Sequence, residues 1–162
     1  MIRAIMAADD MGGISKNGGM PWPKNSLDLQ WFKKNTLNSI VVMGRLTWID
    51  TFIPSPLQGR INVLITNKNK NDYPGADEYI CGDIINNIPD LSDKYSNKDI
   101  FIIGGAQILN QLFCIIEEFY LTRIYGNFDC DKNIDLKKIH ETMTMTKKIE
   151  NDNTCHFEIW KK

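Results

Sequence analysis

The fold of this chain is decided by the stretch Ile100-Phe101-Ile102-Ile103-Gly104-Gly105, in which four consecutive apolar residues lead directly into paired glycines. A short, uninterrupted apolar run is typical of a strand that is buried on both faces. Ala106 to Ile116 then reads as a helix, so strand, tight turn and helix succeed one another. A turn that needs positive φ is the simpler explanation of any one Gly-Gly pair. The same arrangement also lets a phosphate or a flat ring approach the backbone at a helix N-terminus.

Further strands and helices are expected on either side of this unit. Short apolar or β-branched runs predict strands at Ile2 to Ala8, Ser39 to Met43, Ile61 to Ile65, Glu78 to Cys81 and Phe119 to Ile124. Helices are expected at Ser26 to Thr36, directly after Gly44-Arg45, and between Asp83 and Lys94. Pro89 would end or kink the last of these helices.

The C-terminal part predicts two antiparallel strands. Glu141 to Ile149 and His156 to Trp160 are β-rich and are joined by a turn at Glu150 to Asn153. His140 and His156 are read as strand or turn residues. The whole pattern predicts an α/β fold with a mostly parallel central β-sheet, flanking helices and a C-terminal antiparallel hairpin.

Length and composition fit one domain that spans residues 1–162. A net charge of −1, with 24% charged and 43% hydrophobic residues, gives no sign of a nucleic-acid partner. No apolar run is long enough to span a membrane, and no signal peptide is recognisable. The four cysteines are scattered without metal-ligand spacing, so we expect no metal, a reduced compartment and a cytoplasmic protein.

A second glycine turn occurs at Gly44-Arg45, between a predicted strand and a predicted helix. A glycine permits close backbone approach, and an arginine adds a positive fork. Together with Gly104-Gly105, this turn suits a ligand that carries two phosphates. The usual G-x-G-x-x-G fingerprint of a Rossmann site is absent.

Asp28 is a charged residue among apolar neighbours near the start of a predicted helix. Asp28 and Phe32 are four residues apart and therefore lie on one helical face. Asn25 or Ser26 can cap this helix, and the acid then favours the helix dipole by about 0.3–1 kcal/mol. Alternatively, apolar surroundings raise its pKa and make it a proton-handling group. The preceding segment Met11 to Pro23, called the lid below, contains four glycines and reads as a flexible loop that covers something.

Taken together, the motifs resemble the dihydrofolate reductase family over essentially the whole chain. The motifs, in the order of the family, are Met20-Pro21-Trp22, Asp28 with Trp31-Phe32-Lys33 and Asn35-Thr36, Val42-Met43-Gly44-Arg45 with Thr47-Trp48, Gly59-Arg60, Ile102-Ile103-Gly104-Gly105, and Leu121-Thr122-Arg123-Ile124.

The resemblance implies reduction of 7,8-dihydrofolate to 5,6,7,8-tetrahydrofolate by hydride transfer from NADPH, in support of one-carbon metabolism and thymidylate synthesis. By this resemblance Asp28 binds the 2-amino group and N3 of the pterin and promotes protonation of N5. Thr122 bridges Asp28 and the 2-amino group, and Trp22 holds an ordered water. Arg60 takes the α-carboxylate of the glutamate tail, which suits a bidentate guanidinium.

The resemblance also implies the remaining contacts. The substrate is expected against Ile5, Ala7, Asp28, Phe32, Ile53, Leu57, Arg60, Ile103 and Thr122. NADPH is expected against Ala7, Ile14, Met20, Gly44, Arg45, Thr47, Thr66, Asn67, Gly104, Gly105, Ala106 and Gln107. Asp131 is expected to contact the lid. Antifolate-type molecules are the other expected ligands, and a monomer is expected.

Departures from the family pattern concern the cofactor. Leu46 and Gln107 occupy places where family members often carry basic residues. The 2′-phosphate is therefore expected at Arg45 with Thr66, Asn67 or Lys68. Leu109 stands where a tyrosine near the nicotinamide is common.

Two other functions remain open at this point. A pyrimidine reductase of the riboflavin pathway would share the fold, although Asp28 with Arg60 suits a pterin that carries a carboxylate tail. A nucleotide-binding scaffold would have no need of an acid beneath a lid.

Overall fold

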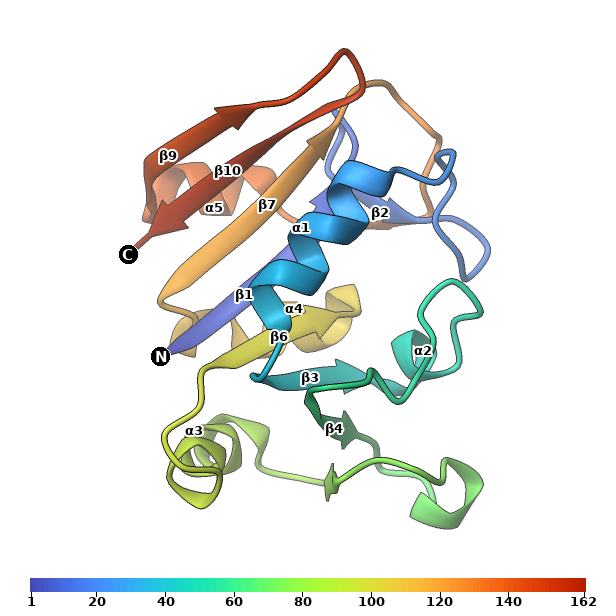
Figure 1. Cartoon of the computed structure of the whole chain (residues 1–162), viewed down its shortest axis with the longest axis vertical. Helices are drawn as coiled ribbons and strands as arrows, with labels where there is room; N and C mark the ends of the chain where they lie inside the picture. Colours follow the sequence, from blue (N-terminus) through green and yellow to red (C-terminus); the bar gives the residue numbers. More distant parts are fainter.

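One twisted sheet of eight strands runs through the computed structural model, which describes residues 1–162. Its strands, in spatial order, are β5 (Glu78–Ile80), β4 (Ile61–Ile65), β3 (Ile40–Gly44), β6 (Ile100–Gly104), β1 (Ile2–Ala8), β7 (Glu118–Ile124), β10 (Cys155–Lys161) and β9 (Thr144–Glu150) (Figure 1). Neighbours from β5 to β7 are parallel, whereas β10 pairs antiparallel with both β7 and β9. The predicted fold class is confirmed.

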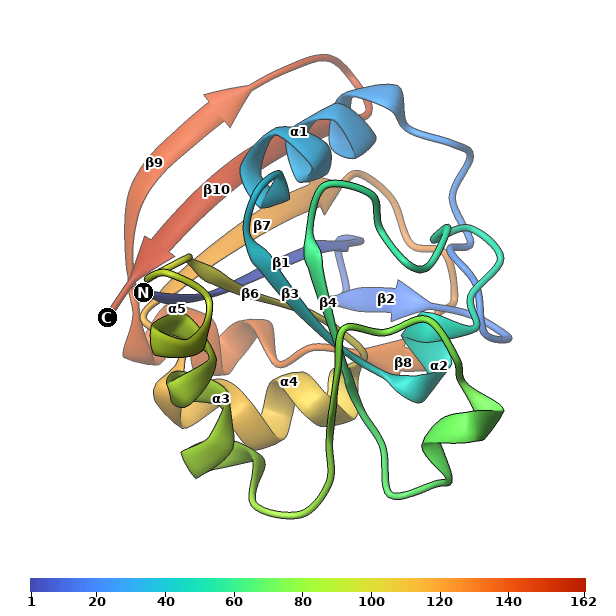
Figure 2. The ribbon, with the colours of Figure 1, turned by 60° about the horizontal axis from the view of Figure 1, so that its bottom comes forward.

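Helices cover both faces of the sheet. Helix α1 (Ser26–Thr36) lies on one face, and α3 (Ile84–Lys94), α4 (Ala106–Leu112) and α5 (Leu136–Thr142) lie on the other (Figure 2). Short elements complete the chain: α2 (Arg45–Trp48), η1 (Lys70–Asp72) and η2 (Phe113–Ile115). Every residue of β3 and β6 is buried. Alternate residues of a strand point to opposite faces of the sheet, and both faces are covered here, so these strands have continuous apolar runs.

Several predicted boundaries are wrong. The predicted strand Glu141 to Ile149 begins only at Thr144, because the chain before it forms α5. Asp135 caps that helix by accepting a hydrogen bond from the Lys138 amide at 2.9 Å. His140 is therefore a helical residue, and its ring stacks on Trp160 with centroids 4.8 Å apart.

Two helix predictions also need correction in detail. Helix α3 continues through Pro89 instead of ending there. The segment predicted as one helix from Ala106 to Ile116 is α4 followed by a 3-10 turn, η2.

The lid has more structure than the predicted flexible loop. Its residues Gly13–Ser15 form β2, which pairs antiparallel with β8 (Lys132–Asn133) in a small second sheet. The lid is thus fixed at one side to the long connection after β7.

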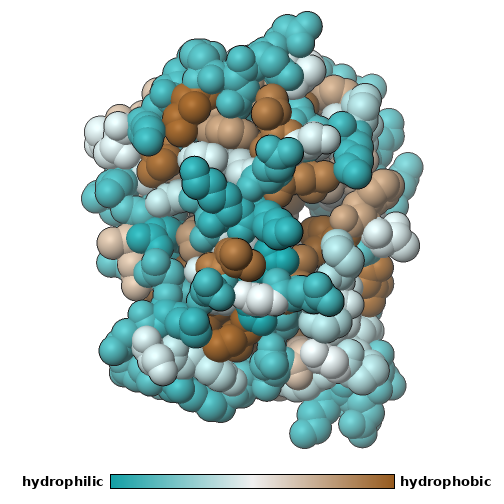
Figure 3. Space-filling view, in the orientation of Figure 1, coloured by the Kyte–Doolittle hydropathy of each residue, from teal (hydrophilic) through white to brown (hydrophobic).

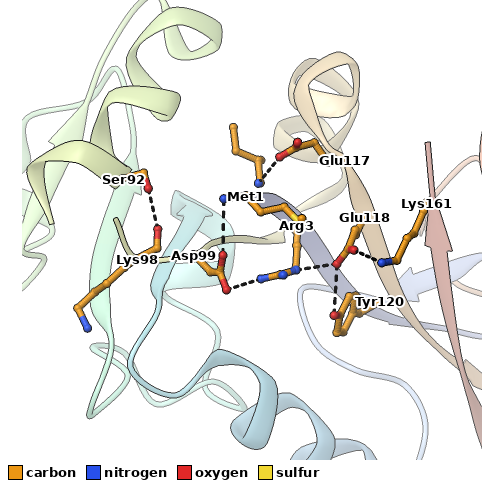
Figure 4. A network of polar contacts seen from close by, with 10 residues as sticks. Met1, Arg3, Ser92, Lys98, Asp99, Glu117, Glu118, Tyr120 and Lys161 are labelled. Atoms are coloured by element: carbon orange, nitrogen blue, oxygen red, sulfur yellow. Dashed lines mark hydrogen bonds and ion pairs between the residues drawn. The ribbon is translucent and has the colours of Figure 1, made fainter. Parts of the chain in front are cut away.

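Charged side chains around the amino ends of β1 and β7 form an ionic network (Figure 4). Glu118 is buried and takes Arg3 Nε at 2.7 Å and Lys161 Nζ at 2.6 Å, while Asp99 pairs with Arg3 and with the N-terminal amine of Met1. The two cations hold the pKa of Glu118 below its usual value, although burial acts in the opposite direction. This end of the sheet is a satisfied ionic network.

Three further findings concern membranes, metals and disulfides. None of the helices has the length and apolar character that a bilayer crossing requires. No three His, Cys, Asp or Glu side chains gather as a metal site would need. All four cysteines are free.

Candidate active site

A cavity of about 850 Å³ opens at the carboxyl ends of β1, β3 and β6. Ligands of open α/β sheets bind at this edge, and the volume is in the range of small-molecule sites. Figure 3 shows the surface hollowed beside α1, with apolar side chains at the border of the hollow. The residues expected at the site that line this cavity are Ile5, Ala7, Ile14, Met20, Asp28, Phe32, Gly44, Arg45, Thr47, Ile53, Leu57, Arg60, Thr66, Asn67, Ile103, Gly104, Gly105, Ala106 and Gln107.

Two expected site residues lie behind the cavity wall. Thr122 is 1% exposed and follows the register of β7, which sets it beside Ala7 of β1. Trp22 is buried and packs edge-to-face on Phe128, with ring centroids 5.9 Å apart. Neither residue is part of the cavity lining.

Asp28 lies in the first turn of α1 and is only 9% exposed. Its backbone N–H donates to the N-cap side chain of Asn25 at 3.1 Å, so the local sequence fixes the start of the helix. Burial raises the pKa of the Asp28 carboxyl. The helix dipole favours the charged form by about 0.3–1 kcal/mol and so acts against the desolvation. Asp28 is therefore both a first-turn acid and a desolvated one.

The Thr122 hydroxyl is a side-chain group that acts on the pKa of this acid. It lowers the pKa of Asp28, but less than burial raises it. The two groups do not reach full hydrogen-bond geometry, and Thr122 Oγ1 is buried without a partner. A buried hydroxyl without a partner costs about 1–3 kcal/mol, which a ligand that bonds to it recovers.

Asp9 is a second buried acid, and its surroundings have the opposite effect. Its carboxylate accepts backbone N–H bonds from Gly13 at 2.8 Å, Met11 at 2.9 Å and Phe128 at 3.0 Å. These donors hold the pKa of Asp9 below its usual value although burial acts against them. Asp9 is thus a structural anchor between the lid and the connection after β7, whereas Asp28 has no backbone donor.

Arg60 lies on the wall formed by the start of β4, and it has no acidic partner in the chain. One guanidinium nitrogen donates to Thr36 Oγ1 at 3.2 Å, and Nε is buried without a partner. Thr36 is fully buried and donates to the Phe32 carbonyl at 2.9 Å, so α1 holds the arginine in place. A half-buried guanidinium without a counter-charge is suited to bind a carboxylate.

The two glycine turns lie side by side, as the pairing of Met43 with Gly104 requires. Helices α2 and α4 begin there, with Gly44 and Gly105 as N-caps that provide no side-chain acceptor. Gly104 has a φ of +127°, and a Cβ on it would lie 3.2 Å from Thr47 Oγ1. The glycines leave the open, donor-rich space that a phosphate-bearing cofactor fits.

The cavity lining also contains basic side chains. Arg45 donates to the Tyr73 hydroxyl at 3.4 Å, and Lys68 lies on the same lining. Leu46 lines the cavity as well, but it offers no charge. Leu109, in contrast, is buried in the core and does not line the cavity.

The expected contact between Asp131 and the lid is confirmed. Asn17 donates its backbone N–H to Asp131 Oδ2 at 2.9 Å, and the Asp131 N–H donates to the Ser15 carbonyl at 3.0 Å. The lid therefore crosses one side of the cavity while tied to the opposite loop.

Some lining residues were missed by the sequence analysis. Lys33 and Lys132 bring positive charge to the cavity, and Asp50 and Phe52 come from the segment between α2 and β4. Lys33 had no clear signal, because adjacent residues of a helix do not share a face with one another. Phe52 had no signal, because only the path of the loop brings it to the cavity.

A desolvated acid, an unpaired arginine and two neighbouring glycine turns in one cavity define the class of protein. It is an enzyme that takes a phosphate-bearing cofactor and an anionic substrate.

Comparisons with known proteins give the family. The family model described as dihydrofolate reductase matches residues 1–162. Dihydrofolate reductase type 8 from Escherichia coli is 30% identical over 99% of this chain and 96% of its own length. A dihydrofolate reductase from Buchnera aphidicola is 37% identical over 78% of this chain and 73% of its own length. The structure of the enzyme from Enterococcus faecalis, complexed with NADP(H) and RAB-propyl, superposes with a TM-score of 0.84 at 25% identity and covers 99% of this chain and 95% of that one.

The chain therefore belongs to the dihydrofolate reductase family, the oxidoreductases that reduce 7,8-dihydrofolate with NADPH. The resemblance inferred from the motifs is confirmed.

Proposed function

We propose that this chain reduces 7,8-dihydrofolate to 5,6,7,8-tetrahydrofolate with NADPH and that Asp28 handles the proton. One observation carries the proposal: a carboxyl whose pKa is raised by burial stands in the same cavity as two glycine turns. When bound, NADPH supplies the hydride that the pterin receives at C6.

Asp28 binds the 2-amino group and N3 of the pterin and promotes protonation at N5. A raised pKa suits this task because it keeps the acid able to hold and release a proton nearer to neutral pH. Thr122 joins Asp28 to the 2-amino group, and its hydroxyl without a partner supports this role. Phe32 and Ile103 enclose the ring and exclude water. Trp22, near the end of the lid, holds a water near the pterin.

Arg60 binds the α-carboxylate of the glutamate tail. Support comes from its lack of an acidic partner and from Thr36, which orients the guanidinium. Ile53 and Leu57 cover the p-aminobenzoyl part between the ring and the tail. An anionic, elongated substrate follows from this arrangement.

The glycine turns receive the phosphates of NADPH together with Arg45, Thr47 and Gln107. Ala7, Ile14 and Met20 adjoin the nicotinamide and its ribose. Arg45 with Thr66, Asn67 or Lys68 takes the 2′-phosphate. Since Leu46 contributes no charge there, the preference for NADPH over NADH is expected to rest on Arg45 and Lys68.

The test is the loss of NADPH absorbance on addition of dihydrofolate, with NADH measured in parallel. Turnover with NADPH and slower turnover with NADH are expected. No turnover with either cofactor would refute the proposed reaction, and equal rates would refute only the assignment of the 2′-phosphate.

We further propose that residues 1–162 act as one domain and as a monomer in the cytoplasm, without a nucleic-acid or membrane partner. Antifolate-type molecules with a pterin-like amino edge would bind at Asp28. The product would serve one-carbon metabolism and thymidylate synthesis.

A further inference from the structure

The tip of the lid is a hairpin turn closed by backbone hydrogen bonds. Lys16 and Gly19 exchange both backbone bonds, from Lys16 N to Gly19 O at 2.8 Å and from Gly19 N to Lys16 O at 3.1 Å. Asn17 and Gly18 between them have φ of 50° and 82°. Two successive left-handed residues form a type I′ turn, for which Asn-Gly is the favoured pair. The tip is therefore preformed and can transmit a contact to the rest of the lid.

Phe52 approaches this tip from the opposite wall of the cavity. It lies in the segment between α2 and β4, in a turn held by Asp50, whose carboxylate accepts the Phe52 N–H at 2.9 Å and whose carbonyl accepts the Ile53 N–H at 3.2 Å. The Phe52 residue is 61% exposed, so it is not a core residue. Gly18, Met20, Phe52 and Ile53 nevertheless line one cavity.

The tip of the lid and the wall that carries Phe52 meet at Gly19. A Cβ on Gly19 would lie 3.0 Å from Cε2 and 3.3 Å from Cδ2 of the Phe52 ring. The φ of Gly19 is outside the left-handed region, so the closeness of the ring, and not the backbone conformation, is what favours glycine here. In Figures 1 and 2 the lid and the segment after α2 approach each other from either side.

We propose that Phe52 is a positioning residue that holds the tip of the lid from the substrate wall and thereby slows the release of ligands bound beneath it. Asp131 holds the same tip from the other side, through Asn17. The tip of the lid is thus held from both sides, and its opening requires the loss of the Phe52 contact. This inference rests on the proposed function, in which the lid covers the reacting rings.

The first test is Phe52→Ala. Dissociation of NADPH and of dihydrofolate, followed by stopped-flow protein fluorescence with competing ligand, is expected to accelerate about fivefold, because changes at one interface act mainly on the off-rate. The KM for dihydrofolate should rise while the hydride-transfer rate in a single turnover stays near that of the wild type. Ile49→Ala is the matched control, since Ile49 is 53% exposed in the same region and does not line the cavity.

A double-mutant cycle separates the contact from a general structural effect. Gly19→Ala alone should also accelerate release, because its methyl group meets the Phe52 ring. In the Phe52→Ala background the same methyl group has room, so Gly19→Ala should have little further effect.

Equal dissociation rates in wild type and Phe52→Ala, or additive effects of the two substitutions, would overturn the inference. Thermal melting checks that each variant is folded. Because dissociation is measured without turnover, a wild type that binds both ligands but does not react would refute the proposed function and leave this inference intact.

Discussion

Asp28→Asn is expected to stabilise the folded chain at alkaline pH, which is unusual for a polar substitution at a buried site. The folded state binds the Asp28 proton more tightly than the unfolded chain, in which the carboxyl has its ordinary pKa of 3.8. Stability therefore falls as the pH rises from that value through the raised folded pKa. Each tenfold difference in proton affinity between the folded and unfolded states removes about 1.4 kcal/mol of stability above this window. Asn carries no charge and escapes the loss.

The size of the effect can be measured by thermal melting across a pH series. A gain of ~1 kcal/mol corresponds to about 2–4 °C in Tm for a chain of this size. The gain should be present at about pH 8 and should shrink toward about pH 3, where the carboxyl is protonated in both states. Turnover should fall about 10²–10⁴-fold at neutral pH, the usual contribution of an acid-base group. Partial recovery at low pH is expected because the substrate then takes its proton from solvent.

Asp9→Asn is the matched control, since Asp9 is also buried but has a lowered pKa. Its stabilising contribution is present above the unfolded pKa and is lost as the pH falls through the folded value. We expect a loss of about 1–3 kcal/mol at neutral pH. A destabilised Asp28→Asn with wild-type turnover would refute the reasoning and leave Asp28 as a helix-terminal acid only.

Three other substitutions test the rest of the site. Arg60→Leu should raise the KM for dihydrofolate about 10–100-fold, which corresponds to the free energy of one hydrogen bond to a charged group, and should leave the KM for NADPH unchanged. Equal increases in both KM values would exclude binding of the glutamate tail by Arg60. Gly104→Ala should destabilise the fold by about 1–3 kcal/mol and weaken NADPH binding, because a Cβ at a φ of +127° also meets Thr47; a wild-type Tm would contradict this. Asp131→Ala should make the lid more sensitive to protease, since the Asn17 amide loses its acceptor; unchanged cleavage would show that β2 and β8 suffice.

The order of elements was readable because each strand carries its own local signal. Ile2–Ala8 and Ile61–Ile65 match the predicted strands to the residue, and Ser26–Thr36 matches the predicted helix. Helix α5 was missed because it has only seven residues, and its last two, Glu141 and Thr142, were assigned to the β-rich run that follows. The Asp135 cap was the available signal.

The Asn-Gly pair at the lid tip was a second available signal. Asn17-Gly18 is a favoured hairpin turn, yet the many glycines of the lid favoured a reading as flexible loop. The pairing of β2 with β8 could not be read, because β8 has two residues and lies far along the chain.

The sequence by itself determined the strand order along the chain, the two glycine turns and the presence of an acid among apolar residues, since each depends on neighbours in the chain. Only the tertiary structure decided what Asp28 and Asp9 do. Both are buried aspartates, but Asp9 receives backbone donors from the adjoining lid and from the distant Phe128, while Asp28 receives none. The direction of a pKa shift depends on which groups replace the lost water, and folding alone brings those groups together.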